Sequence, residues 1–297
     1  MFRRKTFRLR LRSRTLILGE RTLVMGVLNV TPDSFSDGGL FFDASQAITH
    51  ALEMERAGAD LLDIGGESAR PGSTGITAVE ELKRVLPVLE GLRGKLRIPI
   101  SIDTQKAQVA EAAVAAGAEM INDVSALRSD PALAPTIAKI ARRHPLPIIL
   151  MHMRGVPRTM QKRPFARDVL RDVTAGLRAA LARARKAGLA KSQIILDPGI
   201  GFGKSFAQNY ALLARLPELA RLGCPLLVGT SRKTFLGATL AREGVHAPTE
   251  ERIWGTAATV AASILGGAHI VRVHDVAEMV QVACVTDAVL RARVRPS

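Results

Sequence analysis

The sequence predicts a single α/β domain, a (β/α)8 or TIM barrel, with a short strand or hairpin in front of it. Two observations predict this fold. From Leu23 onward a short apolar run, a polar loop and an amphipathic Ala- and Leu-rich stretch recur eight times within the 297 residues. Polar side chains also gather directly after the apolar runs, where a barrel places its active site. We therefore divide the chain into an extension, residues 1–22, and a barrel, residues 23–297.

Each of the eight units contributes one strand and one helix. The expected strands are 23–28, 60–64, 98–102, 119–122, 147–151, 193–197, 225–229 and 268–273. The expected helices are 43–57, 76–90, 105–116, 131–143, 166–187, 206–221, 251–265 and 275–292. Asp43 and Asp130 are typical capping residues at helix starts, and Gly58, Gly117 and Gly188 are typical of helix ends.

A doubly wound open sheet is the alternative fold, and it requires a phosphate-binding fingerprint after an early strand. The stretch 199–205 is rich in glycine, but Pro198 stands where a P-loop needs its first glycine. Lys204 stands where the dinucleotide fingerprint needs its last glycine. The barrel is therefore favoured.

The extension is strongly basic, with seven Lys or Arg residues among the first 14. Phe7, Leu9 and Leu11 alternate with arginines, at the period of a strand with one face outward. A strand or hairpin packed on the body, a disordered tail and an Arg-rich organellar transit peptide all fit this segment, the last with the lowest weight. We assign no catalytic role to it.

Composition limits the classes of protein. No apolar run reaches the 18 residues that a membrane helix needs, so we expect no membrane span. Cys224 and Cys284 lack metal-ligand spacing, which indicates reduced thiols and a cytoplasmic protein. The net charge of +15 suggests affinity for anions, but only 4% of the residues are aromatic, which disfavours nucleic acid as a partner.

The residues after the strands suit a flat ligand with many hydrogen bonds. Asp103, Asn122 and Asp197 can accept parallel N–H bonds from an amino-heterocycle, and Lys233 can donate to a ring carbonyl or nitrogen. An aspartate after a strand is often only a helix cap. Eight consecutive strand ends that all carry polar residues make capping an insufficient explanation for the whole set.

A second group of residues suits a diphosphate. Arg70, Arg272 and His274 form a cationic set. Asn29, with Asp33 and Asp37 nearby, offers the oxygen ligands that Mg²⁺ prefers beside substrate phosphates.

These residues belong to segments that resemble the dihydropteroate synthase family. The resemblance covers about residues 23–289. The matching segments are NVTPDSFSDGG at 29–39, GGESARPG at 65–72, SIDT at 101–104, ND at 122–123, MHM at 151–153, DPGIGFGK at 197–204, SRK at 231–233 and RVHD at 272–275. The first of these and DPGIGFGK are long and specific, whereas the short ones are weak alone.

The resemblance implies a Mg²⁺-dependent transferase that makes 7,8-dihydropteroate from a pterin diphosphate and p-aminobenzoate. The implied roles are pterin binding by Asp103, Asn122, Asp197 and Lys233; diphosphate binding by Asn29, Arg70, Arg272 and His274; magnesium binding by Asn29; and p-aminobenzoate binding by Pro71, Phe202, Lys233 and Thr234. The implied catalytic residues are Phe35, Asp37, Arg70 and Lys233.

In that family the diphosphate leaves first and the amine attacks a pterin-methyl cation, while Phe35 and Asp37 close over the reacting centre. A homodimer through the last helices is usual. One departure is Ala69, where the family commonly has threonine, and we expect this change to alter substrate or sulfonamide affinity.

Two other functions compete with this interpretation. A folate-dependent methyltransferase domain would share the ring-binding Asp and Asn but would not need the loop at 29–39 or Lys233. A silent nucleic-acid-binding protein would carry aromatic and basic residues on one face. Neither accounts for the motifs as a set.

Overall fold

Eight parallel strands form a barrel in the computed structural model, which describes residues 4–31, 40–68, 72–156, 159–160 and 167–292. The strands are β3 (Leu23–Asn29), β4 (Leu61–Gly65), β5 (Ile100–Asp103), β6 (Met120–Asp123), β7 (Ile148–Met151), β8 (Ile194–Asp197), β9 (Leu227–Val228) and β10 (Ile270–Val273). The sheet order runs β8-β7-β6-β5-β4-β3-β10-β9, and a parallel bridge between Leu196 and Leu226 closes the ring. The predicted (β/α)8 barrel is confirmed.

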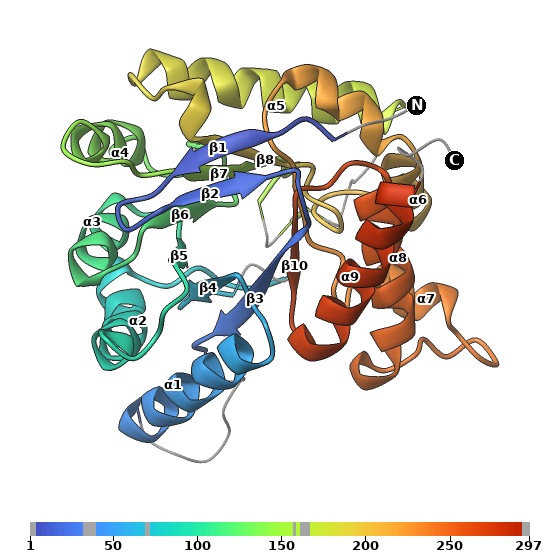
Figure 1. Cartoon of the computed structure of the whole chain (residues 1–297), viewed down its shortest axis with the longest axis horizontal. Coiled ribbons are helices and arrows are strands. Elements are labelled where there is room, and N and C mark those ends of the chain that lie inside the picture. The colour runs from blue at the N-terminus through green and yellow to red at the C-terminus, as the bar shows by residue number, and fades with distance from the viewer. Residues whose placement is uncertain (1–3, 32–39, 69–71, 157–158, 161–166, 293–297) are drawn as a thin grey trace.

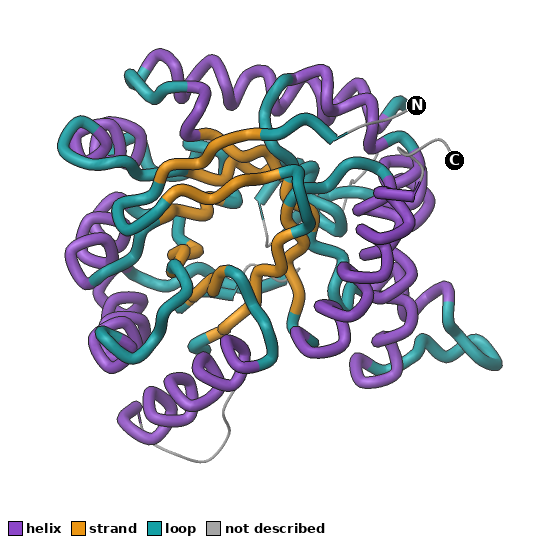
Figure 2. The backbone as a smooth tube through the Cα atoms, viewed as in Figure 1, coloured by secondary structure: helices purple, strands orange, loops and turns teal. Residues whose placement is uncertain are grey.

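Helices surround this ring of strands (Figure 2). They are α1 (Leu40–Arg56), α2 (Ala78–Leu92), α3 (Ala107–Ala116), α4 (Leu133–Ala141), α5 (Val169–Lys186), α6 (Phe206–Ala214), α7 (Thr234–Thr239), α8 (Ile253–Leu265) and α9 (Val276–Ala292). The helix predicted at 206–221 ends early and continues as the 3₁₀ helix Leu216–Leu222, because Pro217 cannot continue an α-helix. The short α7 was not predicted. Within the described ranges no helix has the length and apolarity to cross a membrane.

The helix-end signals were right in part. Gly58, Gly117 and Gly188 follow their helices with positive φ angles of 97°, 122° and 93°. Helix α1 begins at Leu40, before the predicted cap Asp43, and α4 begins at Leu133 rather than at residue 131. Asp130 instead accepts the backbone N–H groups of Ala132 (2.8 Å) and Ala107 (2.7 Å), so its carboxylate joins the segment before α4 to the first residue of α3.

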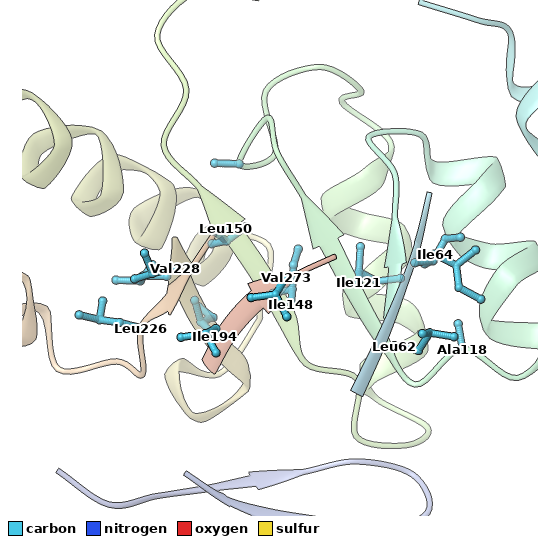
Figure 3. Packing of buried hydrophobic residues seen from close by; sticks show 14 of the residues in the cluster. Leu62, Ile64, Ala118, Ile121, Ile148, Leu150, Ile194, Leu226, Val228 and Val273 are labelled. Atoms are coloured by element: carbon cyan, nitrogen blue, oxygen red, sulfur yellow. The ribbon is translucent and has the colours of Figure 1, made fainter. Parts of the chain in front are cut away.

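Side chains along each strand alternate between two apolar layers. Leu62, Ile148 and Ile194 pack outward against the helices, among the residues drawn in Figure 3. Their neighbours Leu61, Ile149 and Ile195 belong to a separate cluster inside the barrel. The interior is therefore a filled core, and the polar residues that end the strands lie above it.

The basic extension folds as a hairpin that covers the amino-terminal end of the barrel (Figure 1). Strands β1 (Phe7–Arg10) and β2 (Thr15–Leu18) pair antiparallel. Leu9, Leu11 and Leu18 join the interior cluster. The hairpin alternative is thus confirmed, and the Arg4 guanidinium anchors the segment by a buried 2.5 Å ion pair with Asp287 of α9.

Leu18→Ala should lower the free energy of unfolding by about 2–5 kcal/mol, because Leu18 is 0% exposed and its removal leaves a cavity under the barrel. Urea unfolding followed by circular dichroism measures this change. Thr15→Ala on the same strand is the control, since Thr15 is exposed and its loss should cost below about 1 kcal/mol. Equal losses for both variants would show that the hairpin does not pack as described.

Candidate functional site

A cavity of about 480 Å³ lies at the carboxyl-terminal ends of the strands. Of the predicted site residues, those that line it are Asn29, Asp103, Asn122, Asp197, Phe202, Lys233, Thr234, Arg272 and His274. They come from six of the eight strands or the segments that follow them. The barrel thus brings together residues that are up to 245 positions apart (274 − 29). Phe35, Asp37, Arg70 and Pro71 lie outside the described residues, as do Asp33 and Ala69.

Two carboxylates and one guanidinium form the floor of the cavity. Arg272 donates from Nε to Asp63 Oδ2 (2.6 Å) and from Nη2 to Asp103 Oδ2 (3.0 Å). The amide of Asn122 donates to the same oxygen of Asp63, at 2.8 Å. Because Asp63 takes both bonds, it fixes the orientation of the cation and of the amide together.

The floor also holds acceptors that the described protein does not satisfy. Asn122 Oδ1 and Asp63 Oδ1 are buried without a hydrogen-bond partner among the described residues, and Ser101 Oγ is in the same condition. Unpaired buried acceptors are costly unless a ligand or a water donates to them. Only Asn122 of these three lines the cavity, and with the neighbouring carboxylates Asp103 and Asp197 it suits a ligand that has several N–H donors.

Burial controls the protonation of the site carboxyls. It raises the pKa of Asp197 to about 6, against the opposing effects of the Gly199 N–H and Lys233. Burial, with the neighbouring charge of Asp63, also raises the pKa of Asp103, although Arg272 opposes the shift. Asp63 and Asp103 in turn raise the pKa of Arg272 despite its burial, so this side chain stays cationic.

The loop after β8 forms one wall of the cavity. Asp197 Oδ1 accepts the N–H of Gly199 at 2.7 Å, which turns the chain sharply at the end of the strand. Gly199 has φ of 66°, and a Cβ there would lie 1.9 Å from the carbonyl oxygen of His152. At the tip of the loop the Phe202 ring faces Lys233, whose Nζ lies 4.1 Å from the ring centroid.

His274 enters the site as a neutral group. Burial and the nearby Arg272 charge lower the pKa of His274 to about 3, whereas the sequence interpretation counted it as a cation. Ser231 Oγ accepts the backbone N–H of His274 (3.1 Å) and lies 2.9 Å from its Nδ1. The hydroxyl proton can therefore be donated to Nδ1, which leaves Nε2 as a hydrogen-bond donor.

Asn29 is the candidate magnesium ligand within the described residues. It ends β3, is half-buried and lines the cavity. No group of three His, Cys, Asp or Glu side chains in the described ranges could hold a metal by itself. One amide oxygen beside an anion site fits the way Mg²⁺ binds, with few protein ligands, several waters and substrate phosphates.

Sequence reasoning did not single out Asp63. This aspartate sits in the middle of the buried strand β4, 0% exposed, and an acidic residue inside an otherwise apolar run was the available signal. Glu67, in the loop after β4, has a structural role. Its carboxylate accepts the N–H of Ile76 (3.0 Å) and pairs with Lys106 (2.7 Å), which also binds the buried Glu81.

A family profile and the sequences of known proteins place the chain in the same family. Residues 25–274 match the profile of the family described as pterin binding enzyme. The dihydropteroate synthase of Synechocystis sp. is 50% identical over 273 residues, 92% of each chain.

Solved structures agree with the sequence relatives. Dihydropteroate synthase from Xanthomonas albilineans with 4-aminobenzoic acid is 45% identical with a TM-score of 0.87, over 96% of this chain and 99% of that one. The same enzyme in complex with 7,8-dihydropteroate gives 43% identity and a TM-score of 0.83, over 95% and 98% of the two chains. The chain belongs to the dihydropteroate synthases, a family of pterin-binding transferases.

Proposed function

We propose that this chain condenses 7,8-dihydropterin-6-ylmethyl diphosphate with p-aminobenzoate, giving 7,8-dihydropteroate and diphosphate in folate biosynthesis. The observation that carries the proposal is the convergence of Asp103, Asn122, Asp197 and Lys233 on one cavity, where Asn122 Oδ1 is a buried acceptor without a partner among the described residues. A pterin ring offers amino and ring N–H groups along one edge. Ring binding would therefore give the oxygen of Asn122 the donor that it lacks among the described residues.

The proposed reaction proceeds in two steps. The C–O bond between the pterin methylene and the diphosphate breaks first, and the bonding electrons leave with the diphosphate. The amine of p-aminobenzoate then forms the C–N bond and loses a proton. Asn29, Arg70, Arg272 and His274 are the proposed diphosphate ligands, in which Arg272 contributes charge and His274 an N–H donor.

The remaining roles follow from the resemblance and stay proposals. Asp37 would offset the pterin-methyl cation while Phe35 excludes water. Pro71, Phe202, Lys233 and Thr234 would border p-aminobenzoate. Mg²⁺ held by Asn29 would supply charge stabilisation for the departing diphosphate.

Product formation tests the function. Purified protein is mixed with the pterin diphosphate, labelled p-aminobenzoate and Mg²⁺, with and without a chelator. We expect labelled dihydropteroate and equimolar diphosphate, both lost on chelation and restored by added Mg²⁺. Folded protein that binds the pterin but forms no product would contradict the proposal, and product that resists chelation would contradict the role of Mg²⁺.

Pterin affinity should rise with pH through about 6, because ring N–H groups need the ionised form of Asp197. The pKa of this carboxyl is raised from 3.8 to about 6, so proton loss on raising the pH creates the acceptor. Below that point affinity should fall about tenfold per pH unit. Calorimetric titration between pH 4.5 and 8 measures it. Asp103 and Lys204 also face the cavity, so the pH dependence of pterin affinity is compared between the unmodified protein and Asp197→Asn to isolate the contribution of Asp197. The same pH dependence in both proteins would contradict the assignment.

We also propose a cytoplasmic homodimer formed through the last helices. On α8 and α9 the side chains of Trp254, Val285 and Val289 are exposed, Trp254 at 79%. Exposed large apolar side chains on adjacent helices are typical of a self-association surface. Light scattering should give twice the chain mass of 31.8 kDa, and Trp254→Asp should shift it toward one chain. A monomer in the unmodified protein would contradict this proposal.

A further inference from the structure

Lys204 is a lysine buried in the loop after β8, with only 2% of its surface exposed. Its Nζ lies 2.7 Å from the carbonyl oxygen of Gly199, 3.0 Å from that of Phe202 and 3.3 Å from that of His152. A fourth neighbour is Nδ1 of His152, at 3.2 Å. Burial lowers the pKa of Lys204 to about 7, and in the protonated form its three N–H donors are fully used by these four acceptors. Lys204 therefore differs from Lys233, whose Nζ lies over the Phe202 ring.

His152 supports the lysine from the other side. Burial, and after it the charge of Lys204, lowers the pKa of His152 to about 3, so its imidazole is neutral. A neutral ring that accepts at Nδ1 carries its proton on Nε2, and Nε2 lies 3.7 Å from Asp172 Oδ2 of helix α5. Asp172, His152 and Lys204 thus form a row from an outer helix to the loop at the cavity, in which His152 and Lys204 are within hydrogen-bond distance and Asp172 lies just beyond it.

The same loop places Phe202 at the cavity. Gly199 and Gly203 have φ angles of 66° and 65°, and neither has room for a Cβ, because backbone carbonyl oxygens of His152 and Arg154 lie 1.9 Å and 2.5 Å from the Cβ position. This tight path turns the carbonyls of Gly199 and Phe202 inward onto Lys204. Without the ammonium, buried carbonyl groups would converge with no donor between them, a costly arrangement that would drive the loop to another conformation.

We propose that Lys204, oriented by His152 and Asp172, is a positioning residue that fixes Phe202 and thereby sets the affinity for the aromatic amine substrate. This inference rests on the proposed function, in which Phe202 borders p-aminobenzoate. Of the proposed pterin site, Asp63, Asp103, Asn122 and Arg272 make no hydrogen bond to Lys204 among those described above. Asp197 is held by the N–H of Gly199, and the charge of Lys204 opposes the rise of its pKa that burial causes, so the comparison is made at pH 8, where Asp197 is ionised in either case. The two substrates should therefore respond differently when the row is broken.

Lys204→Met keeps the length of the side chain and removes its donors. We expect the KM for p-aminobenzoate to rise at least about tenfold, while the dissociation constant of the pterin, measured by calorimetry, changes less than about threefold. Lys186→Met, an exposed lysine at the end of α5, is the matched control and should change neither constant. Equal losses of affinity for both substrates would overturn the inference, since they would indicate general damage to the site.

Gly176→Ala tests the row from outside the cavity. Gly176 lies within α5, where alanine is the better helix former. A Cβ there would lie 2.4 Å from Cδ2 of His152, so the ring must turn and lose its contact with Lys204. We expect an increase of about three- to tenfold in the KM for p-aminobenzoate, while the variant still unfolds in one cooperative transition at a midpoint well above the assay temperature. This variant keeps the proposal testable even if Lys204→Met does not fold.

A double-mutant cycle tests whether Gly176→Ala acts through the His152 ring. In a His152→Ala background the ring that meets the new methyl group is gone, so Gly176→Ala should add no further change in KM. Full additivity of the two changes, or no effect of Gly176→Ala alone, would overturn the inference. Failure of the proposed function is distinguishable, because the unmodified protein would then make no dihydropteroate at all.

Discussion

Asp197→Asn should weaken pterin binding by about 100-fold or more and reduce turnover at least as much. Asparagine has nearly the same shape and keeps an oxygen that can accept the N–H of Gly199, so the turn after β8 is retained. It lacks the negative charge and presents an NH₂ group, which would face the N–H donors of the ring. Calorimetry with the pterin and the product assay measure both effects.

The matched control is Asp168→Asn at the start of α5. Asp168 caps that helix by accepting the N–H groups of Leu170 and Arg171, and asparagine caps about as well. Pterin affinity and turnover should both be unchanged there. Normal pterin affinity in folded Asp197→Asn would remove this carboxylate from the pterin site and with it the main support for the site assignment.

Arg272→Met should lower the free energy of unfolding by about 3–5 kcal/mol and abolish measurable turnover. The reason is that Asp63 and Asp103 would lose the cation that both of them bind, and Asp63 is fully buried. Methionine keeps much of the apolar stem, so lost packing contributes little. Urea unfolding and the product assay are the two measurements.

Neutralising the carboxylate should rescue stability but not activity. In Arg272→Met, the additional change Asp63→Asn removes the unpaired charge, and we expect it to recover part of the lost free energy of unfolding. Turnover should remain absent, since the diphosphate site still lacks its cation. A double variant that is less stable than Arg272→Met would show that Asp63 does not need the guanidinium as a partner.

Much of the fold could be predicted because its signals are local. The apolar run at 193–197 and the amphipathic stretch at 166–187 correspond to β8 (Ile194–Asp197) and α5 (Val169–Lys186) within about three residues. Helix α7 could not be predicted, because six residues are too few to show a helical periodicity of apolar side chains. The hairpin could be expected from the alternation at residues 7–12, but its place under the barrel depends on contacts with distant strands.

Candidate site residues such as Asn122 and Asp197 could be predicted because a barrel gathers whatever follows its strands. Asp63 and Lys204 could not be given their roles in the same way. Asp63 binds Arg272, 209 positions away, and Lys204 contacts His152, 52 positions away. Such contacts depend on the closure of the barrel and on loop conformation, so no local sequence pattern predicts them.

The hairpin beneath the barrel affects how substrates enter and products leave during turnover. Leu9, Leu11 and Leu18 pack with the inward side chains of the strands at the amino-terminal end, whereas the cavity lies at the carboxyl-terminal end. Substrates and products would then enter and leave through the same opening, the cavity at the carboxyl-terminal ends of the strands. The diphosphate would leave through the opening by which the aromatic amine enters. Diphosphate at high concentration should therefore slow the binding of the next amine.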